Sequence, residues 1–293
     1  MRCELCPRKC GIDREKTLGA CSVPSEIRIA KVMLHMWEEP PISGENGSGA
    51  IFFSGCPLGC VFCQNKEISH TGKGKAVSVR ELADIMLDLQ SRGAHNINLV
   101  SPTQYSDKIR EAIDLVRGEL KIPIVYNTGG YELDSEIEKM RGYVDVFLTD
   151  IKYFSPELSR EYSRAGDYFD HSIKAFLKMH EIAPNCVFDE NGIMQKGVIL
   201  RHLVMPSCRL DSIKILEKVA DAVDISKVKL SLMSQYTPDF CDDKYKKIKR
   251  TVTSFEYDSV VERAMELGYD GYIQEKSSAT KIYTPKFNEE NEK

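Results

Sequence analysis

The segment Ala50–Asn65, AIFFSGCPLGCVFCQN, places three cysteines on a glycine-rich loop directly after an apolar run. Ala50–Ser54 has the composition of a buried strand, and Cys56, Cys60 and Cys63 follow at the spacing C-x3-C-x2-C. Thiolates hold iron–sulfur clusters, and three thiolates from so short a loop can occupy three corners of a cubane cluster. The fourth iron would then keep an open coordination position, which is typical of a catalytic metal site.

Beyond this loop, short β-branched or aromatic runs alternate with amphipathic helical patterns. We predict further strands at 96–100, 122–126, 144–148, 197–204, 228–233 and 271–274, and helices at 78–92, 107–120, 135–141, 168–182, 212–223 and 259–267. Such alternation indicates βα units on a parallel sheet, in either a barrel or a doubly wound fold. In both folds, ligands bind at the carboxyl ends of the strands.

Composition narrows the class of protein. The chain has 293 residues, 42% of them hydrophobic, and 40 Lys and Arg against 44 Asp and Glu give a net charge of −4. This balance argues against a strongly basic nucleic-acid binder. The start, Met-Arg-Cys-Glu, has no apolar signal region, and we see no membrane span. We therefore expect a cytoplasmic protein whose ten cysteines serve metal binding or catalysis.

The cysteine loop, with Phe62 before its third cysteine, resembles that of the radical SAM superfamily. The similarity covers about residues 50–240 and is nearest to the pyruvate formate-lyase activating enzymes and their uncharacterised homologues, whose Cys-His-Asn resembles Cys63-Gln64-Asn65. It implies a partial (β/α)6 TIM-like barrel with a [4Fe–4S] cluster on Cys56, Cys60 and Cys63. S-adenosylmethionine (SAM) would bind the open iron and be cleaved to a 5′-deoxyadenosyl radical. The resemblance also implies a flavodoxin or ferredoxin as electron donor, and suggests a glycine in a partner enzyme as substrate.

The same resemblance places SAM-binding side chains after successive strands. Ser101-Pro102-Thr103 stands where the activating enzymes carry Gly-Gly-Glu, and Thr103 is our candidate ligand for the SAM amino group. Asn127 begins a segment similar to the family's Asp-Thr-Asn-Gly, with a neutral side chain in place of the acidic one. Asp150 and Lys152 resemble the Asp-x-Lys pair of the SAM pocket, and the alternative is a surface ion pair.

The later predicted strands provide further candidate residues for the SAM pocket. Arg201 lies in an otherwise apolar strand, and an arginine at this place contacts SAM in the resembling enzymes. Its neighbour His202 fits a core histidine as well as a functional one. Gln235-Tyr236 stands where the family places its last SAM-pocket residues.

A second group of cysteines precedes the loop. Cys3, Cys6, Cys10 and Cys21 provide four thiols, enough for a closed zinc site or an auxiliary iron–sulfur cluster. We favour zinc; a redox or substrate-handling thiol set is a third interpretation. We divide the chain into a cysteine-rich segment at 1–45, a barrel at 46–283 and a flexible tail at 284–293. Glu38-Glu39, between the two cysteine groups, are either solvated or part of the substrate mouth.

Two other functions fit the sequence. In one, all seven early cysteines hold structural zinc in a non-catalytic interaction module. In the other, the same radical chemistry modifies a nucleic acid, for which Lys244–Arg250 (KYKKIKR) supplies five basic residues. A solvated helix face explains the basic run equally well. The substrate and the oligomeric state do not follow from the sequence.

Overall fold

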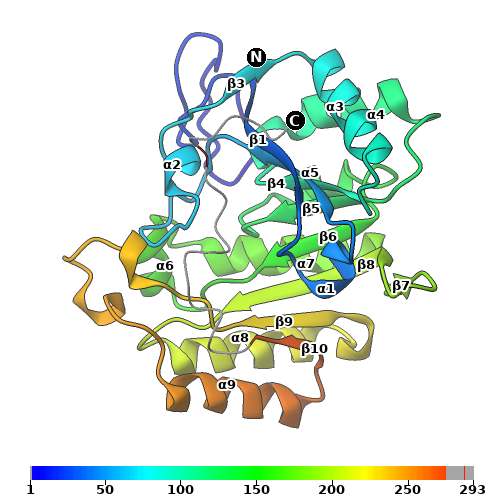
Figure 1. Ribbon diagram of the computed structural model, residues 1–293. Coiled ribbons are helices and arrows are strands. Elements are labelled where there is room, and N and C mark those ends of the chain that lie inside the picture. Colours follow the sequence, from blue (N-terminus) through cyan, green and yellow to red (C-terminus); the bar gives the residue numbers. More distant parts are fainter. Residues whose placement is uncertain (1, 275–286, 288–293) are drawn as a thin grey trace.

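The computed structural model describes residues 2–274 and 287. These residues form one open, curved sheet with helices packed along its outer face (Figure 1). The tail predicted at 284–293 lies outside the described residues, apart from Phe287.

Parallel strands make up most of the sheet. They are β2 (Ser48–Phe53), β4 (Ile97–Val100), β5 (Ile124–Thr128), β6 (Val146–Asp150), β8 (Met194–Leu203), β9 (Lys229–Met233) and β10 (Asp270–Ile273). The strand order is β10-β9-β8-β6-β5-β4-β2-β1-β3, and in the described chain neither edge strand pairs with the other. The predicted partial barrel is therefore confirmed, as an open sheet. A two-residue strand, β7 (Val187–Phe188), pairs antiparallel with β8.

Two antiparallel strands extend the sheet beyond β2, and the sequence did not predict them. The strand β1 (Ile27–His35) runs against β2, pairing Ile29 with Phe53 and His35 with Ser48. The strand β3 (Lys75–Val77) pairs with the start of β1. Because β1 runs opposite to β2, it begins beside the cysteine loop and ends at the amino-terminal mouth of the barrel.

The α-helices of the described residues are α1 (Pro40–Ser43), α2 (Lys66–Ser69), α3 (Val79–Ser91), α4 (Ser106–Val116), α5 (Asp134–Glu138), α6 (Pro156–Ser163), α7 (Tyr168–Ile182), α8 (Arg209–Ala222) and α9 (Ser254–Leu267). The sequence predicted six of them, with bounds that differ by up to five residues, and did not predict α1, α2 and α6. Ser78 caps α3 in a capping box with Glu81, as expected. No helix in the described part of the chain is long and apolar enough to cross a bilayer.

The short helix α1 closes the amino-terminal mouth of the barrel. Ile42 is fully buried and packs with an apolar layer from the inner face of the sheet (Val125, Val146, Leu148, Met194 and Ile199). The Asn96 amide donates a 2.7 Å hydrogen bond to the Ile42 carbonyl. This plug sets the position of Glu38 and Glu39, which immediately precede α1.

Candidate active site

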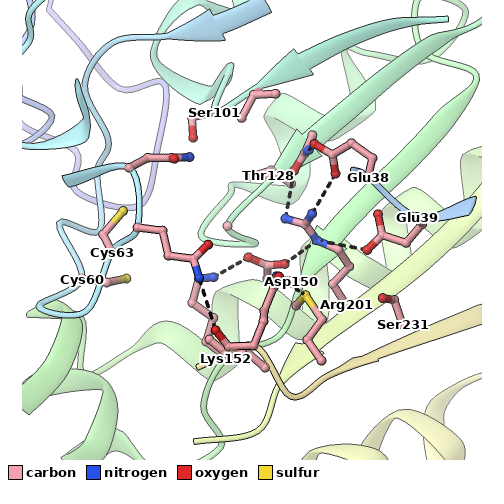
Figure 2. Close-up of a pocket in the computed structure, with 18 of the residues that line it drawn as sticks. Glu38, Glu39, Cys60, Cys63, Ser101, Thr128, Asp150, Lys152, Arg201 and Ser231 are labelled. Carbon is pink, nitrogen blue, oxygen red and sulfur yellow. Dashed lines mark hydrogen bonds and ion pairs between the residues drawn. The ribbon is translucent and has the colours of Figure 1, made fainter. Parts of the chain in front are cut away.

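A cavity of about 290 Å³ occupies the inside of the barrel above this plug. The cysteine loop lines one end, and the side chains of Glu38 and Glu39 lie at the other (Figure 2). Between them project polar side chains from the carboxyl ends of β5, β6 and β8. This is the location expected for a ligand site in a parallel sheet of this kind.

All three thiols of the loop line the cavity, and none is in a disulfide. The Sγ of Cys60 lies 2.9 Å from the Ser163 hydroxyl, and Cys63 accepts a 3.4 Å hydrogen bond from Ser69. Burial raises the pKa of Cys56 to about 12 and also raises the pKa of Cys63, with the neighbouring thiols adding to both effects. Such thiols become thiolates when a metal cation offsets the cost of burying their charge.

The three thiols of the loop are not arranged around a single-ion site. Within residues 2–274 no three Cys, His, Asp or Glu side chains converge on a common point at single-ion distances. A cubane cluster does not require this, because each cysteine binds a different iron. Gly59 has φ +58°, and a Cβ there would find nothing closer than His70 Nε2 at 3.8 Å, so its backbone is free to curve around a bulky group. The residues present therefore fit a cluster on Cys56, Cys60 and Cys63.

Arg201 is the centre of a buried charge network. Its Nε donates to Asp150 at 2.9 Å, one terminal nitrogen donates to Glu38 at 3.2 Å, and the other donates to Asn127 at 3.1 Å. Lys152 forms an ion pair with the second oxygen of Asp150. Four of the residues predicted for SAM binding (Asn127, Asp150, Lys152 and Arg201) thus line one cavity together.

The electrostatics of this network favour the charged forms at its centre. Burial alone would raise the pKa of Asp150, but Arg201 and Lys152 outweigh it and hold that pKa below its usual range. The pKa of Lys152 is raised in turn, because the charge of Asp150 outweighs burial. The surface ion pair considered from the sequence is therefore buried: the Asp150 side chain is 9% exposed and that of Lys152 is 19% exposed.

Thr103 does not line the cavity. Its hydroxyl donates a 2.6 Å hydrogen bond to Glu132, and Thr128 donates a 2.5 Å hydrogen bond to the same oxygen. Burial raises the pKa of Glu132 to about 7 in spite of both hydroxyls. Ser101, the first residue after β4, lines the cavity instead, with φ +59°. Our assignment of Thr103 as ligand of the SAM amino group stays a prediction. Of the two hydroxyl side chains of Ser101 and Thr103, that of Ser101 is the one that lines the cavity.

Of the other residues singled out at the later strands, Gln235 lines the cavity, whereas His202 and Tyr236 do not. His202 is 1% exposed, contacts the Ile151 carbonyl through Nδ1 at 2.7 Å and does not line the cavity. Burial lowers its pKa to about 4, so it behaves as a neutral core histidine. Gln235 lines the cavity, and its carbonyl accepts a 3.3 Å hydrogen bond from Gln64 of the cysteine loop. The Tyr236 hydroxyl donates instead to the Ile248 carbonyl.

The first group of cysteines packs against the cysteine loop. Cys3, Cys6, Cys10 and Cys21 lie in a compact segment in which Cys3 exchanges backbone hydrogen bonds with Ile12 and Gly11. Burial raises the pKa of Cys6 to about 12, and neighbouring thiols of the group contribute. Arg8 fastens this segment to the barrel by donating to the carbonyl of Pro57 at 2.8 Å. The metal of this group, zinc or an auxiliary cluster, stays a prediction.

Two of the five basic residues in the run Lys244–Arg250 form ion pairs, and all five are exposed. Lys249 forms an ion pair with Asp243 at 3.0 Å, and Arg250 pairs with Glu256 at 2.6 Å. Ile248, which precedes Lys249, is buried. No observation here favours a nucleic-acid substrate.

Comparison with known proteins identifies the class. Residues 50–194 match the family model of the radical SAM superfamily, and this part of the chain belongs to that superfamily. The resemblance drawn from the cysteine loop is thereby confirmed. The superfamily implies an enzyme that uses a [4Fe–4S] cluster and SAM.

The chain is similar to proteins of several organisms. An uncharacterised protein of Methanocaldococcus jannaschii is 29% identical over 279 residues, which cover 92% of this chain and 75% of that protein. SuiB of Streptococcus suis, in a crystal structure with SAM, has a TM-score of 0.51 and 16% identity. The match covers 75% of this chain and 47% of SuiB, so the chain spans about half the length of SuiB. A radical SAM methyltransferase from Sphaerobacter thermophilus has a TM-score of 0.50 and 11% identity, over 78% of this chain and 66% of the methyltransferase. At such identities the structures show a shared fold.

Proposed function

We propose that Cys56, Cys60 and Cys63 hold the cluster of this radical SAM enzyme and that SAM lies between the cysteine loop and Arg201. The observation that carries the proposal is that three free thiols and the buried Asp150–Lys152–Arg201 network open on one cavity. A cavity that joins several thiols to charged groups with shifted pKa values is the usual setting of catalysis.

The cluster, when bound, supplies the electron that cleaves SAM to methionine and a 5′-deoxyadenosyl radical. The chain's part is to orient SAM and to keep water from the reacting atoms. Lys152 and Asp150 present a charged donor and a charged acceptor at the end of β6, which suit a carboxylate and a ribose hydroxyl. Apolar side chains around the loop (Phe52, Leu58, Phe62, Leu203 and Met233) line the same cavity and exclude water.

The overall reaction we propose is hydrogen abstraction from a substrate held in this cavity, which makes the chain an oxidoreductase. Its resemblance to activating enzymes supports a glycine of a partner enzyme as one such substrate, and a flavodoxin or ferredoxin as the electron donor. Free thiols at all ten cysteines suit a reducing cytoplasm.

The test is anaerobic reconstitution followed by dithionite reduction, addition of SAM and quantification of 5′-deoxyadenosine. We expect the wild-type chain to form 5′-deoxyadenosine, and the C60A variant to fall to the background rate because the cluster loses one of its three ligands. C186A is the control, because Cys186 is likewise a free thiol, half-buried where Cys60 is buried, and does not line the cavity.

Iron, zinc and acid-labile sulfide are counted in the same samples. A wild-type chain that binds zinc but no iron would support the non-catalytic zinc module instead. A C60A variant with undiminished 5′-deoxyadenosine would overturn the ligand assignment.

A further inference from the structure

At the end of the cavity opposite the cysteine loop, Glu38 and Glu39 differ in the hydrogen bonds that they receive. The charged residues that line the cavity in the described chain are three carboxylates (Glu38, Glu39 and Asp150) and two cations (Lys152 and Arg201). Asp150 and Glu38 both receive hydrogen bonds from Arg201. Glu39 lies farther from Arg201 and receives no hydrogen bond from it.

The hydrogen bonds of Arg201 go to residues other than Glu39. Its Nε lies 2.9 Å from Asp150 but 3.9 Å from Glu39 Oε1, and its two terminal nitrogens donate to Glu38 and Asn127. The other carboxylate oxygen of Glu39, Oε2, has no hydrogen-bond partner among the described residues. The Glu39 side chain is only 6% exposed, but it lines the cavity, so a group bound there is the available source of the missing partner.

Leaving a carboxylate in this state is costly. A buried charge without a hydrogen-bonding counter-ion is strongly unfavourable, and a cationic ligand that pairs with it removes that cost. Burial raises the pKa of Glu39 above its usual range, and the nearby Glu38 adds to the rise although Arg201 opposes it. Ser231, on β9, is among the groups that lower this pKa, and Tyr272, on β10, lines the cavity alongside.

From this geometry we infer that Glu39 is a recognition site for a positively charged amine of the substrate, held between the α1 plug and strands β9 and β10. The inference rests on the proposed function, because it assigns a substrate class to the same cavity. An ammonium group donates hydrogen bonds in several directions and supplies the missing charge, so it can satisfy Oε2 and the neighbouring Ser231 hydroxyl together. A glycine within a peptide carries no such group, so the inference favours amine-bearing small molecules or peptides.

SAM itself carries an ammonium and a sulfonium group, so the experiment must separate the two sources. Figure 2 shows Cys60 and Cys63 on the far side of Arg201 from Glu39. An amine bound at Glu39 should therefore bind together with SAM, whereas a SAM group at Glu39 would compete with it.

The test measures binding of methylamine, putrescine and L-lysine, and of the N-acetylated forms of the two diamines, by calorimetry on the reconstituted holoenzyme with saturating SAM. We expect at least one free amine to bind and full N-acetylation to abolish its binding. E39Q should weaken the amine at least tenfold and leave the affinity for SAM within twofold, while E39D retains part of the amine affinity. E190Q, which changes an exposed glutamate in a turn outside the cavity, should leave both affinities unchanged.

Several outcomes would overturn the inference: no amine of the panel binds, E39Q leaves amine binding unchanged, or E39Q weakens SAM as much as the amine. The E39D variant and thermal unfolding curves separate loss of recognition from misfolding. Formation of 5′-deoxyadenosine is measured in parallel. Amine binding by a cluster-loaded chain that does not cleave SAM would refute the proposed function and leave the amine site standing.

Discussion

The backbone amide of Cys56 donates a 3.3 Å hydrogen bond to the carbonyl of Cys21. This contact joins the last cysteine of the first group to the first cysteine of the loop, 35 residues later. The two groups of thiols therefore form adjoining parts of one structure, with Gly55 at the junction.

Gly55 is the position where this junction is most sensitive to substitution. Its φ is +83°, and an added Cβ would lie 2.5 Å from the Cys21 carbonyl oxygen. We expect G55A to lower the free energy of unfolding by about 3 kcal/mol or more, from backbone strain and the clash together. The iron bound after reconstitution should fall with it. Chemical denaturation and iron counting measure the two effects.

G93A is the matched control for this substitution. Gly93 has φ +85°, but an added Cβ would meet nothing within 4 Å. The control carries the backbone strain without the clash and should cost about 1 kcal/mol. Equal losses in the two variants would mean that the approach of Cys21 to the loop has no energetic weight.

The first group of cysteines should bind a metal of its own. We expect C10S to lose this metal, zinc by our preference, while the chain still takes up about four irons per molecule on the loop. The melting temperature should also fall, because metal binding and folding of such a segment are coupled. Mass spectrometry of the metals in C10S and in the control C186S checks this. Identical metal contents in wild type and C10S would contradict the prediction.

Replacing Arg201 should expose how much its carboxylate partners depend on it. R201M leaves Glu38 and Asp150 without their guanidinium, and an unpaired buried charge typically costs 3–5 kcal/mol, so we expect a loss of about 4 kcal/mol. Adding E38Q should recover part of that loss, because it removes one unpaired charge. A double-mutant cycle measured by urea denaturation gives the coupling.

The half-exposed Arg263 provides the comparison, since it pairs with Glu217 at 3.0 Å on the surface. R263M should cost less than about 1 kcal/mol. If R201M cost no more than R263M, the network would not be a buried electrostatic unit.

The buried carboxyl of Glu132 predicts a pH dependence of stability. Its pKa is raised from 4.5 to about 7 in the folded protein, so the folded state binds a proton that the unfolded state releases. The free energy of unfolding should therefore fall as the pH rises from about 4.5 to about 7, and level off above. E132Q stays neutral and can still accept from both threonine hydroxyls.

We accordingly expect E132Q to be more stable than wild type at pH 8, by up to about 3 kcal/mol, and close to wild type at pH 5. Melting temperatures of both proteins across this range provide the measurement. A difference between them that does not change with pH would show that Glu132 is not a buried titrating group.

The sequence predicted those parts of the site that depend on local pattern. The cysteine loop and the helix at Tyr168–Ile182 lie where spacing and periodicity placed them, whereas β5 and β6 end two residues beyond their predicted ends. Asp150 and Arg201 converge because the carboxyl ends of neighbouring parallel strands meet, here β6 and β8.

The parts that the sequence did not predict depend on distant partners. Glu38 and Glu39 resemble a solvated pair in the sequence, whereas in the structure both line the cavity and Arg201, 163 residues from Glu38, donates a hydrogen bond to Glu38. The strand at Ile27–His35 lies between β2 and β3, but Arg28 and Lys31 interrupt its apolar pattern, and both of its partners lie later in the chain. Thr103 was chosen by its place in a motif, whereas the turn at Ser101 decides which hydroxyl meets the cavity.

Because β1 runs antiparallel to β2, this one strand connects the two ends of the cavity. The segment with the first four cysteines precedes β1, and the two glutamates at the opposite end of the cavity follow it. Because neighbouring side chains on a strand point to opposite faces, deleting one residue from β1 would reverse the faces of its side chains and displace the segments at both ends. Change along this stretch is thus confined to substitutions, to steps of two residues, or to the irregular register between Ile29 and Lys31, where the strand already absorbs an offset.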